Sequence, residues 1–116
     1  MAQITSSRDL DAYRQSLREA KRLFDRTRSW PEEERYALAD QICRSSRAVG
    51  APVAEAWGRR RYQGAFAEKL TQAWLGHARL AGYLSQAEYD DFDTAWGHIG
   101  GWVRRMIQRA DRFVEH

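Results

Sequence analysis

A run of apolar residues near the C-terminus constrains the fold more than any other feature of this sequence. Between Tyr89 and Phe113 the apolar positions recur at alternating steps of three and four residues, the spacing that keeps one face of an α-helix against its neighbours in a bundle. Ser85 and Glu88 precede the run at the spacing of a helix-capping box. The pattern predicts a long final helix whose buried face is made by Tyr89, Phe92, Trp96, Ile99, Val103, Met106, Ala110 and Phe113.

Three earlier segments carry the same helical spacing. The first, residues 7–28, is marked by Leu10, Tyr13, Leu17, Ala20 and Phe24. The second starts at Pro31, ends at Gly58, bends near Gly50–Pro52 because proline removes a backbone donor, and is marked by Leu38, Ile42, Ser45, Val49, Val53 and Ala56. The third, which Gly82 ends, is marked by Tyr62, Phe66, Leu70, Ala73, His77 and Leu80.

The composition agrees with a helical protein. The 116 residues include only 2 prolines and 8 glycines, and the abundant Ala, Leu, Arg, Glu and Gln favour helix over sheet. Four helices with short connections predict an all-α, up-down-up-down antiparallel four-helix bundle that forms one domain over residues 1–116. The lone Cys43, the lack of an apolar run of about 20 residues and the lack of a signal peptide predict a cytoplasmic protein with no membrane contact.

The segment from Asp40 to Phe66 carries the most specific motif. Its elements are Asp40-Gln41-Ile42, Arg44, Val53-Ala54-Glu55-Ala56-Trp57, Arg59-Arg60-Arg61-Tyr62 and Phe66. Related elements follow at Thr71-Gln72, Trp74-Leu75 and Gly82-Tyr83-Leu84-Ser85, and Glu34-Arg35-Tyr36 comes before. Together they resemble the bacterial four-helix-bundle family of ribosomal-RNA intervening-sequence proteins, whose genes lie inside large-subunit ribosomal RNA genes.

The resemblance implies more about architecture than about activity. It implies a ring-shaped homopentamer and a relation to the accessory protein of diversity-generating retroelements, a basic pentamer that partners a reverse transcriptase. We therefore expect a homo-oligomer, with RNA or DNA as a possible ligand and a reverse-transcriptase-like protein as a possible partner. No small-molecule substrate is implied.

Arginines are the candidate contacts to nucleic acid. The net charge is +3, and only Lys21 and Lys69 among the 19 basic residues are lysines, so most positive groups are the planar, bidentate donors that suit phosphate. The predicted phosphate contacts are Arg59, Arg60 and Arg61 together with a row on the first helix, Arg14, Arg18, Arg22 and Arg26. The alternative reading is a solvated, mixed-charge surface in a pure assembly module.

Trp102 lies outside the apolar face of the final helix, on the side of His98, Arg105 and Arg109. Because a soluble monomer rarely exposes a tryptophan, this face either packs against another subunit or presents a ring on which a base can stack. The first alternative is favoured, so these four residues are the predicted oligomer interface. Gly97, Gly100 and Gly101 weaken this helix, which predicts a close approach by a neighbouring helix.

The sequence predicts no enzyme. It shows no nucleophile with a nearby base, no metal-ligand spacing and no phosphate loop, so no catalytic residue, metal or cofactor is assigned. Asp40 and Glu55 precede Arg44 and Arg59 by four residues, which favours helix-stabilising ion pairs over acid-base catalysis. Cys43 is predicted to be a buried or half-buried thiol, and His77 a core or interface histidine.

Overall fold

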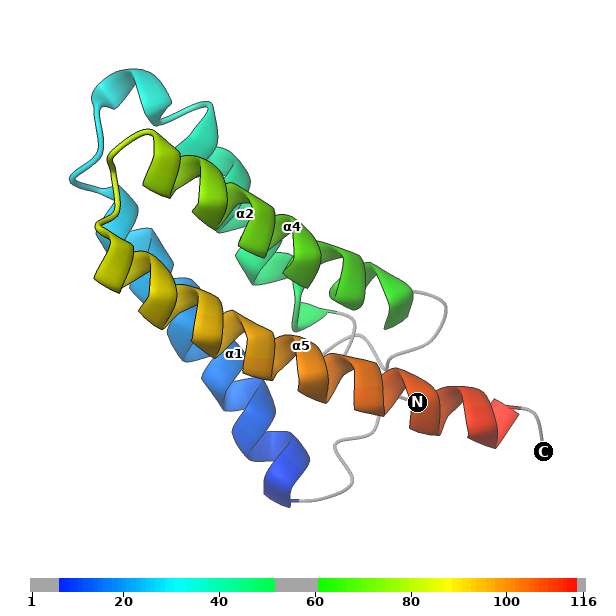
Figure 1. Ribbon diagram of the computed structural model, residues 1–116. Coiled ribbons are helices and arrows are strands. Elements are labelled where there is room, and N and C mark those ends of the chain that lie inside the picture. The colour runs from blue at the N-terminus through cyan, green and yellow to red at the C-terminus, as the bar shows by residue number, and fades with distance from the viewer. Residues whose placement is uncertain (1–6, 52–60, 115–116) are drawn as a thin grey trace.

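The computed structural model describes residues 7–51 and 61–114, and every regular element in these ranges is helical. The elements are α1 (Ser7–Thr27), the short 3₁₀ helix η1 (Glu32–Glu34), α2 (Leu38–Ala48), α4 (Arg61–Leu80) and α5 (Gln86–Val114). Successive long helices run in opposite directions (Figure 1). Contacts join α1 to α2, α2 to α4, α4 to α5 and α5 back to α1, so the predicted up-down-up-down bundle is confirmed.

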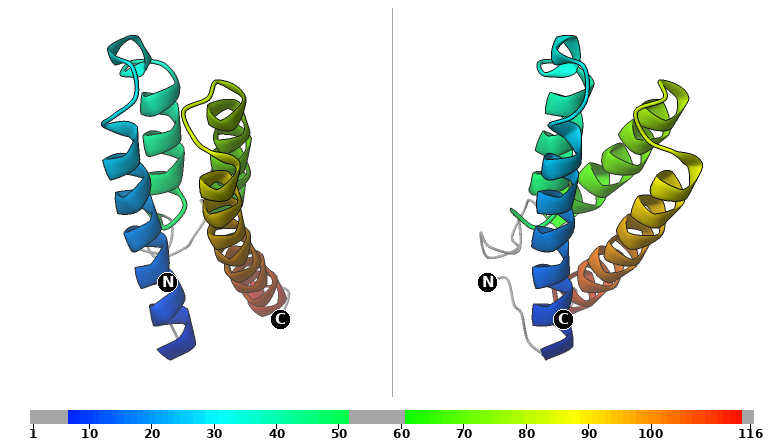
Figure 2. Two further views of the ribbon diagram at one scale, coloured as in Figure 1. Left: turned by 60° about the vertical axis from the view of Figure 1, so that its left-hand side comes forward. Right: turned by 90° about the vertical axis from the view of Figure 1, so that its left-hand side faces the viewer.

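The bundle is elongated, with principal extents of 50 × 25 × 18 Å. In Figure 2, α1 and α2 stand side by side in one view, and α4 and α5 lean away from them in the other. The core between these pairs includes Leu23 of α1, Ile42 of α2, Leu75 of α4 and Trp96 of α5, all fully buried. No described helix is long and apolar enough to cross a lipid bilayer.

The predicted apolar face of α5 is confirmed for the side chains that are described. Five members are buried, and Tyr89 and Ala110 pack at its edge, whereas the side chain of Phe113 lies outside the description. The capping box also forms: the Ser85 backbone N–H donates to Glu88 Oε1 at 2.9 Å, and the Glu88 N–H donates to Ser85 Oγ at 3.1 Å. The buried members are Phe92, Trp96, Ile99, Val103 and Met106.

The C-terminus of α4 is also as predicted. Gly82 has a positive φ of 83°, which only glycine adopts readily. The Tyr83 N–H donates to the carbonyl of Ala78 at 2.9 Å, and the Gly82 N–H donates to that of Arg79 at 3.0 Å. This pair of bonds is a Schellman motif, and it fixes the turn that sends the chain back along the bundle as α5.

The prediction that the second helix starts at Pro31 is wrong. Pro31 precedes only the single turn of η1, and α2 begins at Leu38. The reason is that η1 buries no residue, and tertiary burial of an apolar face supplies most helical stability in proteins. The predicted bend corresponds to the turn at Val49 and Gly50 after the end of α2, whereas the later part of that predicted helix lies outside the described residues.

The predicted core face of α4 is wrong as well. Tyr62, Phe66 and Leu80 are 53%, 66% and 76% exposed, and His77 is exposed beside the ring of Trp74. A second set at helical spacing faces the core, and it consists mainly of small residues, which let α4 approach α2 and α5 closely. The buried set is Gly64, Ala67, Glu68, Thr71, Leu75 and Ala78.

Candidate nucleic-acid interface

Two arginines of the predicted row on α1, Arg22 and Arg26, form ion pairs with carboxylates of α5. Arg22 donates to Glu19 at 2.7 Å and to Asp91 of α5 at 2.5 Å, and its guanidinium lies 4.0 Å from the centre of the Phe92 ring. These contacts hold α1 against α5. A phosphate at Arg22 would have to compete with two carboxylates that are already in place.

Arg26 is held still more firmly. It donates to both carboxylate oxygens of Glu88, at 2.7 and 3.1 Å, and to the carbonyl of Tyr83 at 2.9 Å. The hydrogen bond from Arg26, followed by the one from the Ser85 backbone, lowers the pKa of Glu88 to about 2. Arg26 thus ties the end of α1 to the capping box of α5, which is a structural role.

The other predicted phosphate contacts have different positions. Arg14 and Arg18 are exposed on α1, and neither has a carboxylate partner in the part of the chain that the structure describes. Arg59 and Arg60 lie outside the described residues, as does the side chain of Arg61, the first residue of α4. The structure therefore describes the row on α1 and not the side chains of the arginine triplet.

Trp102 was predicted to be an exposed tryptophan that needs a partner subunit to cover it. This expectation of exposure is wrong, because Trp102 is only 4% exposed in the single chain. Helix α5 packs against both α1 and α4, so its buried sector is wider than one apolar seam, and Ile107 is buried too. Arg109 donates to both oxygens of Asp9 at 2.9 Å, which anchors the start of α1. His98 and Arg105 are exposed and stay predicted interface residues.

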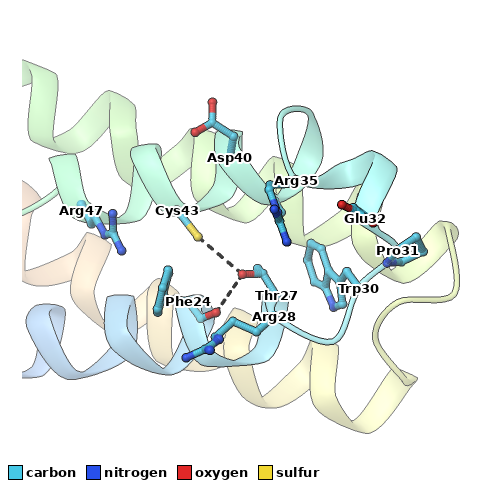
Figure 3. A pocket seen from close by; sticks show the side chains of 11 residues that line it. Phe24, Thr27, Arg28, Trp30, Pro31, Glu32, Arg35, Asp40, Cys43 and Arg47 are labelled. Atoms are coloured by element: carbon cyan, nitrogen blue, oxygen red, sulfur yellow. Dashed lines mark hydrogen bonds between the residues drawn. The ribbon is translucent and has the colours of Figure 1, made fainter.

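A groove that the sequence did not reveal opens between the end of α1, η1 and one face of α2 from Ala39 to Arg47 (Figure 3). Its volume is about 780 Å³. Three exposed arginines reach it from three places: Arg28 just after α1, Arg35 just after η1, and Arg47 in the last turn of α2. Because these residues come from separate segments, no sequence spacing connects them.

The aromatic side of this groove is Phe24, which was predicted to be a core residue but is 36% exposed. The guanidinium of Arg47 lies 5.0 Å from the centre of the Phe24 ring, and that of Arg28 lies 5.9 Å from it. Trp30, also in the lining, is buried and packs on Tyr83. The groove therefore offers cations and an aromatic face at the same place.

Cys43 also lines the groove as a buried free thiol, which confirms its predicted burial. Its Sγ lies 3.7 Å from Oγ1 of Thr27, and the Thr27 hydroxyl donates to the Phe24 carbonyl at 2.8 Å. The predicted ion pair between Asp40 and Arg44 forms, with 3.6 Å between Asp40 Oδ2 and Arg44 Nη1. The second predicted pair, Glu55 with Arg59, falls outside the described residues.

Glu68 is a buried carboxylic acid that the sequence did not single out. It is 1% exposed between α4 and α5, and neither carboxyl oxygen has a hydrogen-bond partner among the described residues. A Cβ atom on Gly100 would lie 2.5 Å from its carboxyl carbon, so the predicted close approach is confirmed at Gly100, whereas Gly97 and Gly101 have more room. Burial raises the pKa of Glu68.

Comparisons with known proteins agree with the resemblance. The family model for the 23S rRNA-intervening sequence protein matches residues 8–104. No curated protein and no solved structure matches the chain. The matched residues extend from the first turn of α1 into the second half of α5, which is most of the chain, and the protein therefore belongs to the family of 23S rRNA-intervening sequence proteins.

Proposed function

We propose that this protein is a non-enzymatic, ring-forming homo-oligomer of the bacterial cytoplasm that associates with nucleic acid through arginine–phosphate contacts that do not read sequence. The observation that carries the proposal is the division of its arginines. Arg22, Arg26 and Arg109 are neutralised by carboxylates inside the chain, whereas Arg14 and Arg18 are exposed with no such partner among the described residues. Exposed, unneutralised guanidinium groups suit phosphate.

The oligomeric part of the proposal has separate support. Tyr62, Phe66 and Leu80 lie on one face of α4 and are more than half exposed, although the Tyr62 hydroxyl donates to Asp111 of α5 at 2.5 Å. A row of exposed apolar side chains on one helix is typical of a surface that packs against another chain. This row therefore replaces Trp102 as the main candidate for the subunit contact, and a pentameric ring with a reverse-transcriptase-like partner remains part of the proposal.

The same row on α4 favours a second candidate function, an assembly or protein-interaction module that does not bind nucleic acid. In that case the exposed arginines only balance acidic groups across subunit contacts. The two candidates differ in one measurable property. Phosphate contacts release counterions, so nucleic-acid binding must weaken as salt rises.

The test is fluorescence anisotropy with a labelled structured RNA at increasing salt. Two to four phosphate contacts predict a loss of about 10- to 100-fold in affinity between about 50 and about 200 mM salt. Replacing both Arg14 and Arg18 by alanine should weaken binding and reduce the slope of log affinity against log salt by about 2. Absence of binding at low salt would reject the first candidate and favour the assembly module.

A further inference from the structure

The groove between α1, η1 and α2 has the dimensions of a ligand site. Its volume of about 780 Å³ lies within the range of about 300–1,000 Å³ that small-molecule sites occupy. It is built from the end of α1, η1 and one face of α2. The connection between the two helices is fixed by hydrogen bonds from the N–H of Trp30 to Thr27 O and from the N–H of Glu34 to Pro31 O. The site is therefore held by ordered backbone.

The charges of the groove favour an anion. Arg28, Arg35 and Arg47 have no carboxylate partner among the described residues. The acids in the lining are Glu32, at the outer end of the groove, and Asp40, which lies near Arg44 and points away from the gap (Figure 3). Three cations that line one concave site raise the local concentration of anions.

The start of α2 adds little to this field. The N-terminus of a helix carries a partial positive charge that attracts anions. The Leu38 N–H already donates to Glu34 Oε1 at 3.4 Å, and Asp40 lies in the first turn. The three guanidinium groups therefore supply the positive charge of the groove.

The aromatic ring selects among anions. Phe24 is partly exposed, and the guanidinium groups of Arg47 and Arg28 lie over its ring, 5.0 and 5.9 Å from the ring centre. Stacking on an aromatic ring is the usual way in which proteins hold a single unpaired base, and a base that stacks on Phe24 takes the place of a guanidinium group there. A sulfate, a phosphate ion or an acidic peptide would use the arginines and leave the ring unused. A base in a duplex is already stacked and paired, so it cannot reach the ring.

We propose that this groove holds an unpaired nucleotide of a single-stranded nucleic acid, with its phosphate on Arg28, Arg35 and Arg47 and its base against the ring of Phe24. The inference rests on the proposed function and adds to it a specific site and the class of nucleic acid. Single-stranded RNA and single-stranded DNA both carry the phosphate and the base, so either can bind in this groove.

The test is anisotropy of the full chain with a labelled ten-nucleotide single strand, as RNA and as DNA, and with a duplex of equal length. The Arg35→Ala/Arg47→Ala double variant should bind either single strand at least about tenfold more weakly and reduce the salt slope by about 1.4. Phe24→Leu should bind about 5- to 100-fold more weakly with the slope unchanged, because it removes the ring and keeps the charge. Arg112→Ala, an exposed arginine of α5, is the matched control.

Three results would overturn the inference. The first is a wild type that binds single strands while the Arg35→Ala/Arg47→Ala and Phe24→Leu variants bind equally well, which rejects the groove and leaves the proposed function intact. The second is a duplex that binds more tightly than the single strand, or polyglutamate that displaces the strand at matched charge. The third is a wild type that binds no nucleic acid at low salt, which rejects both proposals together.

Discussion

Replacing Glu68 by methionine should stabilise the protein, although the change removes a charged group from its interior. Glu68 is 1% exposed, its two carboxyl oxygens have no hydrogen-bond partner among the described residues, and it lies against Gly100 of α5. A buried polar group without a partner costs about 1–3 kcal/mol, and more when it is ionised. Methionine has a similar length and no group to desolvate, so it fits the same space.

The expected gain at neutral pH is therefore about 1–3 kcal/mol in the free energy of unfolding. For a domain of this size, that corresponds to an increase of about 4–12 °C in Tm. The gain should grow with pH. Burial raises the pKa of Glu68, and this effect outweighs the opposing charges of Lys69 and Arg104.

The direction follows from proton linkage. Because the pKa of Glu68 is higher in the folded protein than its ordinary value of 4.5, the folded state binds more protons above that value. The contribution of Glu68 to stability therefore falls as pH rises from about 4.5 until the folded carboxyl has ionised. Glu68→Met removes this fall, so its advantage over the wild type should be larger at about pH 8 than at about pH 5.

The assay is thermal and urea unfolding followed by circular dichroism at several pH values. Glu68→Gln keeps the shape and cannot ionise, so it should also lose the pH dependence but gain less stability. Glu33→Gln, the same change at an exposed site of η1, should stay within about 0.5 kcal/mol of the wild type. A Glu68→Met protein that is less stable at every pH would refute the reasoning, because it would mean that the carboxyl has a partner in solution.

Three further changes test other parts of the structure. Glu88→Ala should lower the free energy of urea unfolding by about 1–2 kcal/mol, since it removes the capping box and the bond to Arg26. Because the pKa of Glu88 is lowered to about 2, the stabilisation by its carboxylate is present above about pH 4.5 and is lost on acidification. A Glu88→Ala variant as stable as the wild type at pH 7 would contradict this prediction. Gly82→Ala should lower stability by about 1–2 kcal/mol because of the positive φ of 83°, and an unchanged Tm would argue against the Schellman turn. Phe66→Lys should reduce the oligomer mass measured by size-exclusion chromatography, since Phe66 is 66% exposed on α4, whereas Lys69→Ala, an exposed residue beside the row, should not.

Local rules of sequence predicted the helices of this protein well. The capping box at Ser85, the glycine turn at Gly82 and the apolar face of α5 each depend on residues within one or two turns of each other, so their signals survive in the sequence. The start of α2 did not follow its local signal at Pro31, because the segment after that proline has no apolar face to bury.

Which side of α4 is buried could not be predicted from the residues of α4 alone. Both Tyr62 with Phe66 and Ala67 with Thr71 obey helical spacing, and the larger residues looked like the core. The bundle instead buried the small ones, because α4 lies close to α2, where Thr71 Oγ1 donates to Ser45 Oγ at 2.9 Å. Which face is buried depends on the neighbouring helices, and the sequence of one helix does not contain that information.

The candidate site was predicted only in part. The sequence singled out arginines as candidate phosphate contacts, but it could not show that Arg22 and Arg26 reach carboxylates on α5, 69 and 62 residues away. Nor could it show that Arg28, Arg35 and Arg47 line one groove, because they come from the end of α1, the end of η1 and the last turn of α2. Both facts depend on tertiary contacts between separate segments.

Light scattering on the full chain, alone and with a structured RNA at about 50 and about 200 mM salt, tests the proposed function most directly. A homo-oligomer that gains mass with RNA at low salt and releases the RNA at higher salt is the predicted result. An oligomer whose mass does not change with RNA at low salt would contradict nucleic-acid association and leave the assembly module, whereas a monomer would contradict the subunit contact on α4.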